Sequence, residues 1–294
     1  MPGNSPELHP SLASEYRRWA TELGEEQRCH QLAVTTSEVL KAHFLLADYF
    51  RDVGEGIGGV GPKSVHLLHS AVSRQGVSFG GHDKWQDLYS IAGTLFFGLV
   101  KNHAFHDANK RTALLVALYQ LQCHGRVPDV PQREFEDLAV RVAEGELSRY
   151  PSFRDFKGKA DPEVLFISRF FRKGTREVNK RDFKVTFRQL STILGRHGFK
   201  LGNGHDNRIE VLQPVEEQYG LFGARRRIVE RRVTTIGFRD WGTDVSPKDV
   251  REVRRATGLT HEAGFDTTVL LQGLDPMETL IAEYSVPLRR LARK

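Results

Sequence analysis

The sequence predicts a multi-domain α and α+β protein, in which an all-helical domain precedes a smaller α+β domain. Its 294 residues exceed the usual size of one domain. Apolar residues in the first half recur at intervals of three and four, as in core-facing helices, whereas several stretches in the second half alternate as strands do. Pro151 and Pro162 interrupt the chain between the halves. We therefore expect an N-terminal extension at 1–30, a helical domain at 31–155 and a basic α+β domain at 163–294.

The first half contains a series of helical patterns, two of which flank residues 103–111. The expected helices cover residues 11–23, 36–51, 63–73, 85–100, 112–124 and 132–145. Residues 54–62 hold five glycines and are predicted to form a loop. Residues 73–84, which combine glycines with alternating apolar positions, are predicted to form a loop or a short hairpin.

The second half mixes both periodicities. The expected elements are a helix at 186–197, strands at 207–212 and 227–236, a helix at 246–258, a strand at 267–271 and a helix at 276–291. This helix–strand–strand–helix order resembles the double-stranded-RNA-binding-like fold of small toxins of the HicA type. Gly204 and His205 lie near the position of their Gly-Ser-His signature, but the Ser is absent, so we assign no catalysis there.

Charge is distributed unevenly along the chain. The net charge is +6, yet residues 160–294 hold 25 Lys/Arg against 18 Asp/Glu, while residues 1–159 are nearly balanced. A base-rich half is typical of proteins that contact RNA, DNA or an acidic protein. Arg225–Arg227 and Arg231–Arg232 could contact phosphates. They could equally form a solvated edge that discourages strand pairing.

Cysteine content and hydropathy indicate the compartment. Cys29 and Cys123 lie far apart and form no C-x-x-C pair, which is typical of a reducing environment. The sequence contains no run of 18 apolar residues and no signal-like N-terminus. We therefore expect a cytoplasmic protein with no membrane contact.

The stretch His103-Ala-Phe-His-Asp-Ala-Asn-Lys-Arg111 concentrates the groups that phosphoryl chemistry needs. Its last residues enter a helix, whose N-terminus attracts anions through unpaired N–H groups. Lys110 and Arg111 add two positive charges there, and Asn109 adds an amide donor. Asp107 has the chemistry of a Mg²⁺ ligand. His103 carries an imidazole, which can accept a proton from a hydroxyl near neutral pH.

These residues and their spacing resemble the H-x-F-x-[D/E]-x-N-x-R motif of the Fic/Doc family, and Asp107–Leu114 resembles its Doc, or death-on-curing, branch. The resemblance implies an all-helical fold around residues 35–150. It also implies that His103 is the general base, Asp107 the metal ligand, and Asn109, Lys110 and Arg111 the phosphate-binding residues of an enzyme that uses ATP and Mg²⁺.

Residue 110 bears on the reaction type. Family members that transfer AMP to protein hydroxyls usually have Gly where this chain has Lys110. In Doc-type members the nucleotide is held the other way round, and the γ-phosphate is transferred. The resemblance thus implies a toxin-like protein Ser/Thr kinase that arrests translation, with elongation factor Tu as the family's known target. Two alternatives stay open: AMP transfer by the same site, and nucleic-acid or partner binding through the basic half.

Two further implications concern partners. In the family, a flap like residues 73–84 docks the target segment by strand addition. Some Fic proteins also carry an inhibitory glutamate in an [S/T]-x-x-x-E-[G/N] helix, and the chain contains no such match. We therefore expect restraint by an antitoxin or another inhibitor in trans, or by the chain's own C-terminal half.

Two rival interpretations use the same histidines. His106-Asp107 is also the dipeptide of a metal-dependent phosphohydrolase family, which would need a further His and Asp. His66, His69 or His82 and Asp129 or Asp137 could serve, but this interpretation leaves Asn109, Lys110 and Arg111 unexplained. A zinc site at His103 and His106 lacks the further ligands that close such sites.

Overall fold

The structure, a computed structural model, divides the chain into two compact units. The first unit consists of residues 1–177 and 276–294, and the second of residues 178–275. The residues described are 6, 8–24, 27–52, 57–177, 185–219, 225–260, 263–265 and 276–293. The first unit is mainly helical and the second is α+β, so the expected fold class is confirmed.

The unit boundaries differ from those expected at 155 and 163. Helix α7 (Pro162–Gly174) packs against α4 (Leu88–Lys101) in the first unit, because one side of α7 buries large apolar residues such as Phe166 and Phe171. The chain then passes through the second unit and returns to the first at Pro276. The composition shift near residue 160 therefore does not mark a domain boundary. The strand expected at 267–271 lies outside the described residues.

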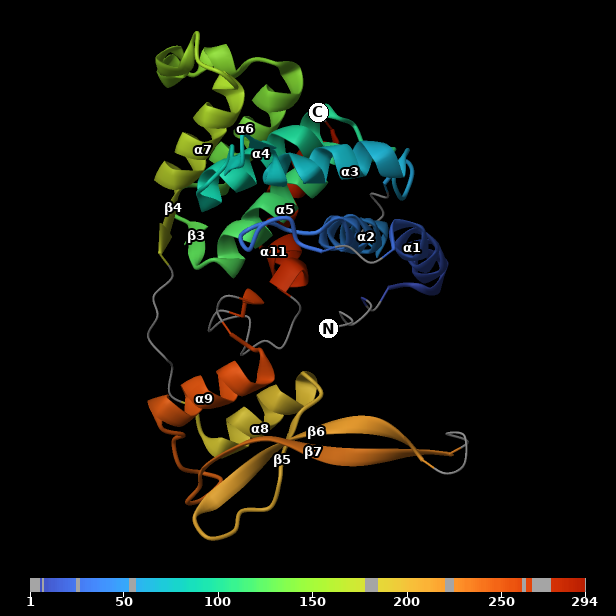
Figure 1. Ribbon diagram of the computed structural model, residues 1–294, viewed down its shortest axis with the longest axis vertical. Helices are drawn as coiled ribbons and strands as arrows, with labels where there is room; N and C mark the ends of the chain where they lie inside the picture. The colour runs from blue at the N-terminus through green and yellow to red at the C-terminus, as the bar shows by residue number, and fades with distance from the viewer. Residues whose placement is uncertain are drawn as a thin grey trace. The chain divides into compact units, whose positions relative to one another are not determined.

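The first unit is built around two helices, α4 and α5 (Figure 1). Residues 102–108, which connect them, are called the motif loop. Helix α5 covers Asn109–Cys123 and is buried over nearly its whole length. The other helices are α1 (Pro10–Leu23), α2 (Thr36–Asp52), α3 (Val65–Ser73), α6 (Gln132–Glu144), α7, α11 (Pro276–Glu283) and α12 (Ser285–Ala292). Asp87 begins α4 with a capping box to Ser90, which explains why the helix starts three residues later than its apolar pattern predicts.

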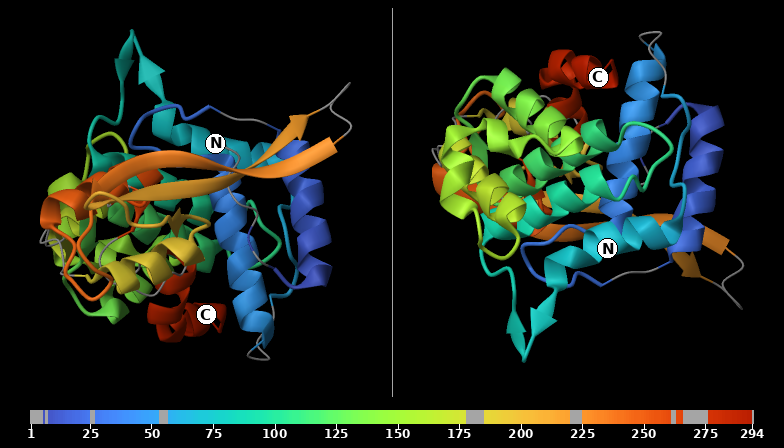
Figure 2. Two further views of the ribbon diagram at one scale, coloured as in Figure 1. Left: turned by 90° about the horizontal axis from the view of Figure 1, so that it is seen from below. Right: turned by 90° about the horizontal axis from the view of Figure 1, so that it is seen from above.

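Two short antiparallel strand pairs complete the first unit. Strands β1 (Ser78–Phe79) and β2 (His82–Asp83) pair antiparallel around Gly80 and Gly81, whose φ values of 59° and 79° suit glycine. This hairpin projects from the helices, as the teal arrows in Figure 2 show. Strands β3 (Arg126–Pro128) and β4 (Thr175–Glu177) also pair antiparallel, although α6 and α7 separate them in the chain. The hairpin expected within residues 73–84 is thus confirmed.

The second unit has the order helix, three strands, helix. Its elements are α8 (Phe187–Arg196), β5 (Lys200–Leu201), β6 (Arg208–Tyr219), β7 (Arg225–Gly237) and α9 (Pro247–Thr257). The strands form an antiparallel sheet in the order β5-β6-β7, and α8 and α9 share a core with it. Both expected long strands are confirmed, although each is longer than its alternating pattern.

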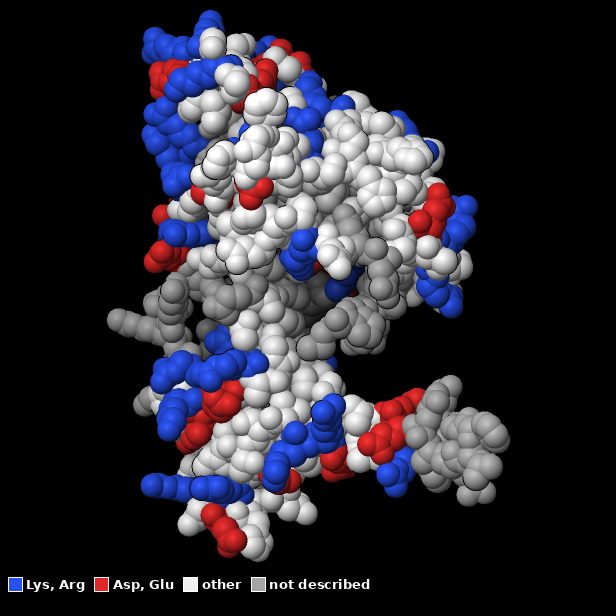
Figure 3. Space-filling model, viewed as in Figure 1, with Lys and Arg blue, Asp and Glu red and all other residues white. Residues whose placement is uncertain are grey.

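Strands β6 and β7 form a ribbon in which opposite charges face each other. Arg227 pairs with Glu217 at 3.0 Å, and Arg232 pairs with Glu210 at 2.9 Å. Acidic and basic side chains are interleaved on the face of the ribbon drawn in Figure 3. These cross-strand pairs favour the solvated edge over a continuous phosphate-binding surface.

No helix within the described ranges is both long and apolar enough to cross a membrane.

Candidate active site

The motif loop between α4 and α5 is held in an unusual backbone conformation. His103 and Ala108 have φ values of 48° and 60°, in the left-handed region that residues with a Cβ rarely adopt. Asn109 closes the loop with two 2.9 Å bonds: its Oδ1 accepts from the Phe105 N–H, and its Nδ2 donates to the Phe105 carbonyl. The Phe105 ring is fully buried. The loop is thus fixed by its own residues, as strained functional loops must be.

His43, on α2, packs against the motif loop and helps to hold it in place. Its ring stacks on Phe105 with centroids 4.0 Å apart. Its Nε2 accepts a hydrogen bond from the Gly61 N–H at 3.1 Å, so the proton of the neutral ring lies on Nδ1, which contacts Thr112 Oγ1 at 3.1 Å. Burial, the nearby Arg111 guanidinium and His106 lower the pKa of His43 to about 3, and the charge of Asp107 offsets only part of this. His43 is therefore a neutral structural residue.

Sequence reasoning missed His43. The signal available was a polar residue within the apolar pattern of residues 36–51, and the pattern does not reveal which distant groups such a residue meets.

Residues 57–62, the described part of the glycine-rich loop predicted at 54–62, lie directly against the motif loop. Pro62 bridges to Phe105, and the Lys63 N–H donates to the Ala104 carbonyl at 2.7 Å. A Cβ placed on Gly59 would lie 2.8 Å from the His106 Cβ, and one on Gly61 would overlap the Trp19 indole. Glycine is therefore required at both positions, because the neighbouring side chains approach the backbone so closely.

Asp107 receives several hydrogen bonds that favour its charged form. Its Oδ2 accepts from the Gly58 N–H at 2.9 Å and lies 3.3 Å from Arg111 Nη2, while its Oδ1 accepts from the Ala108 N–H. Burial alone would raise the pKa of Asp107, but these N–H groups and Arg111 outweigh it, and the pKa lies below its ordinary value. The side chain is 42% exposed, so a charged carboxylate faces the solvent side of the loop.

The three residues expected to bind phosphate have different surroundings. The Arg111 side chain is only 2% exposed, and its guanidinium lies over the Phe50 ring as well as beside Asp107. Asn109 is bonded to the Phe105 backbone. Lys110 is partly exposed. Helix α5 begins at Asn109, and its N-cap residue, Ala108, makes no side-chain capping hydrogen bond.

All five residues singled out in the sequence line one pocket of about 180 Å³. His103, Asp107, Asn109, Lys110 and Arg111 share it with Lys63, His106, Ala108, Ala143, Leu291 and Ala292. Four of the lining residues were not expected from the sequence, because they reach the pocket only through tertiary packing: Lys63, Ala143, Leu291 and Ala292. The pocket combines an open helix N-terminus, exposed lysines, a carboxylate and an imidazole. Such a set can bind a polyphosphate and accept a proton from a nearby hydroxyl.

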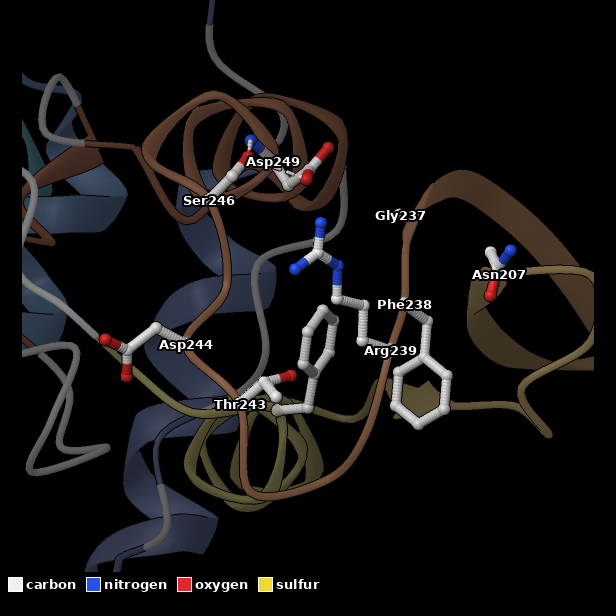
Figure 4. A pocket seen from close by; sticks show the side chains of 9 residues that line it. Asn207, Gly237, Phe238, Arg239, Thr243, Asp244, Ser246 and Asp249 are labelled. Atoms are coloured by element: carbon white, nitrogen blue, oxygen red, sulfur yellow. Dashed lines mark hydrogen bonds between the residues drawn. The ribbon is translucent and has the colours of Figure 1, made fainter.

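A larger cavity, of about 650 Å³, lies in the second unit. Arg239 projects into it, and Asp244, Ser246 and Asp249 line it (Figure 4). Ser246 caps α9 by accepting from the Asp249 N–H at 3.1 Å, and its hydroxyl lies 2.7 Å from Asp249 Oδ2. Ser246 and Asp249 therefore have a structural role, which is to cap the N-terminus of α9. The smaller pocket carries the chemistry expected from the sequence.

The rival metal interpretations find no support in the geometry. Within the ranges that the structure describes, no three His, Cys, Asp or Glu side chains gather closely enough to hold a metal ion. The residues considered for a phosphohydrolase or zinc site are all inside those ranges.

Comparison with known proteins adds independent evidence. Residues 33–121, from the start of α2 into α5, match the model of the Fic/DOC family. The chain is 41% identical over 68 residues to a protein of Escherichia phage P1 described as protein kinase doc, and these residues are 23% of this chain and 52% of that protein. The chain thus spans about half the length of this curated relative. No solved structure matches the chain. Residues 33–121 therefore carry a Fic/DOC family domain, and part of the chain is similar to a protein of the Doc branch.

Proposed function

We propose that the chain transfers the γ-phosphate of ATP to a Ser or Thr hydroxyl of a protein target. One observation carries the proposal: the pocket of about 180 Å³ places His103, Asp107 and Lys110 together at an uncapped helix N-terminus. A reaction dominated by charge on phosphate oxygens needs fixed N–H dipoles and cations, and an attacking hydroxyl needs a base.

The proposed roles follow from position. The N–H groups at the start of α5 and the Lys110 ammonium bind the phosphate oxygens. Asn109 retains one amide hydrogen beyond its bond to Phe105, and Arg111 adds positive charge from the pocket wall. His103 accepts the hydroxyl proton as the target oxygen bonds to the γ-phosphorus and ADP leaves.

Asp107 fits a magnesium ion that enters with the nucleotide. Its lowered pKa keeps it charged, and Mg²⁺ in such sites takes one or two carboxylates plus phosphate oxygens. The ion would supply positive charge that offsets the charge of the transferred phosphoryl group.

Lys110 supports phosphate transfer over AMP transfer. It occupies the position where family members that transfer AMP usually have Gly, and it lines the pocket. We therefore propose the nucleotide orientation of the Doc branch. Incubation of the protein with a lysate and ATP labelled at the α- or γ-phosphate decides between the two: we expect only γ-label on the target, with a mass increase of ~80 Da.

The base is tested by His103→Ala. We expect it to lower the transfer rate by roughly 10²–10⁴-fold, which is the usual contribution of a general base. His205→Ala, which changes an exposed His of the second unit, is the matched control and should leave the rate unchanged. Equal rates for His103→Ala and the parent would remove the support for this mechanism.

The target and partners are proposed from the family. We propose elongation factor Tu as the target, docked along the β1–β2 hairpin, and translation arrest as the consequence. ATP and this factor are both cytoplasmic, so we place the reaction there. An antitoxin in trans is the proposed restraint.

Nucleic-acid binding by the second unit is the weaker alternative. Residues 178–275 hold 17 Lys/Arg against 13 Asp/Glu, a smaller excess than the whole C-terminal half has. The ion pairs of Arg227 and Arg232 neutralise part of that excess. A gel shift of the full chain with RNA and DNA tests this alternative, and a salt-sensitive shift would support it.

A further inference from the structure

The end of the chain rejoins the first unit after the whole second unit. Helices α11 and α12 pack against α5, and α12 also packs against α6. Their large side chains belong to the main core: Met277, Leu280, Ile281, Tyr284, Leu288 and Leu291. The segment is thus an integral part of the first unit.

Polar contacts fix α12 in place. Gln132 Nε2 donates to the Glu283 carbonyl at 2.9 Å, at the junction between α11 and α12. Arg290 Nη1 lies 3.5 Å from Glu136 Oε2, and the Glu136 side chain is only 2% exposed. Leu291 is buried beside this pair, and Ala292 is exposed. The last turn of α12 is therefore held by core packing on one side and faces open space on the other.

That last turn forms one wall of the motif pocket. Leu291 and Ala292 line it together with residues of the motif loop, α5, α6 and Lys63. With this wall present, the pocket is about 180 Å³, whereas sites that enclose a drug-sized ligand are roughly 300–1,000 Å³. This volume matches the polyphosphate part of a nucleotide better than a whole nucleotide.

We propose that the last turn of α12 determines what the pocket accepts, with Ala292 setting its width: the polyphosphate enters and the nucleoside stays outside. The inference rests on the proposed function, because it assumes that this pocket binds phosphate. Ala292 has the smallest side chain with a Cβ, so each larger residue at this position would reduce the space left for the phosphates.

A graded series at residue 292 tests the proposal in the full chain. Ala292→Val, Ala292→Leu and Ala292→Trp are compared by titration calorimetry with magnesium tripolyphosphate and with magnesium ATP. We expect affinity for both ligands to fall progressively with side-chain size, by about tenfold or more for Trp, because a larger side chain at the pocket wall takes up space that the phosphates would occupy. Val286→Trp is the matched control, because Val286 is 51% exposed on the same helix and does not line the pocket.

The outcomes separate the two proposals. If the parent binds both ligands and the series binds them equally well, α12 is not the determining wall, while the proposed function stands. If the parent binds neither ligand, both proposals fail. Thermal unfolding of each variant shows whether the fold is kept; should the Trp variant not fold, Val and Leu still give the size dependence.

Discussion

His43 shows how a residue far from the motif in sequence can hold the motif in place. It contacts Phe105, Gly61 and Thr112, which belong to three different segments. A neutral ring is needed, because its Nε2 must accept from the Gly61 N–H. Protonation would place a second donor opposite that N–H and a charge beside Arg111. The geometry of the site is therefore tied to the charge state of one buried imidazole.

This coupling predicts a specific pH dependence of stability. The pKa of His43 is about 3 in the folded chain and about 6.5 when unfolded. Above pH ~6.5 both states are neutral and His43 contributes no pH dependence. Below it the unfolded state takes up a proton that the folded state does not, so the free energy of unfolding falls, by about 2 kcal/mol at pH 5.

Urea unfolding of the parent and of His43→Gln at pH 7.5 and pH 5 measures this contribution. Gln cannot titrate, so we expect its free energy of unfolding to fall less than that of the parent between the two pH values. At pH 7.5 the variant should be the less stable of the two, because the hydrogen bonds of the ring are changed. Equal losses on acidification would show that His43 does not titrate as proposed.

The residues of the site were predictable where the chemistry is local. His103, Asp107 and Lys110 stand within nine positions, and the combination of a base, a carboxylate and a cation at this spacing already indicates phosphoryl chemistry. The surroundings of Asn109 and Arg111 were not predictable, because Asn109 bonds to Phe105 and Arg111 is buried beside Phe50. Those contacts depend on the backbone conformation of the motif loop and on the packing of α2, which brings Phe50 against Arg111.

Among the elements, the glycine-rich loop has the clearest steric requirement. Its backbone approaches the motif loop so closely that a Cβ at Gly59 would lie 2.8 Å from the His106 Cβ. Neither atom is the end of a flexible side chain, so one loop must move. The sequence predicted a loop at these residues, but the reason for its glycines is a tertiary contact.

Gly59→Ala is therefore expected to lower transfer activity at least tenfold by shifting the loop that carries His103 and Asp107. Gly195→Ala is the matched control, since nothing lies within 4 Å of its Cβ position and it stands in helix α8. There we expect unchanged activity and a stability gain of roughly 0.5–1 kcal/mol. Initial rates and thermal unfolding of both variants make the comparison; unchanged activity of Gly59→Ala would contradict the steric argument.

The β1–β2 hairpin presents an aromatic ring to solvent. Phe79 is 90% exposed, and Val77 beside the hairpin is exposed as well. Turn glycines and alternation predicted the hairpin, because both are local signals. The length of the β6–β7 ribbon was not predictable, because beyond residue 212 its charged residues obscure the alternation.

Phe79→Ser should weaken modification of the protein target about tenfold, because it removes apolar contact area from the proposed docking strand. Binding of ATP should be unchanged, since Phe79 does not line the pocket. Ile228→Ser removes a comparably exposed apolar side chain from the second unit, where Ile228 is 72% exposed, and should have no effect. Target modification at several target concentrations, with calorimetry of ATP, would show whether the loss is confined to the target.

At the scale of the whole molecule, the second unit is an insertion in the first. The sequence placed a boundary near 160 because charge and periodicity change there, and both are properties of local composition. Packing decides otherwise: α7 and α12 are basic like the second unit, yet their apolar sides, together with that of α11, complete the first core. Patterns along a chain do not report which core a helix joins.

An insertion can be removed, whereas a C-terminal domain boundary at 177 would cut through a core. A chain that ends at residue 177 lacks α11 and α12 and leaves their large partners exposed. Burial of each lost side chain is worth roughly 1.5–3 kcal/mol, so six of them approach the whole stability of a typical domain. We expect that chain to be unfolded or strongly destabilised.

Joining residue 177 to residue 276 through a flexible Gly/Ser linker of about 20 residues should restore cooperative unfolding and tripolyphosphate binding, because it returns α11 and α12 to the core and Leu291 to the pocket. Circular dichroism melts and calorimetry of the two chains check this, and equal stability of both would show that residues 276–294 are not part of the first unit.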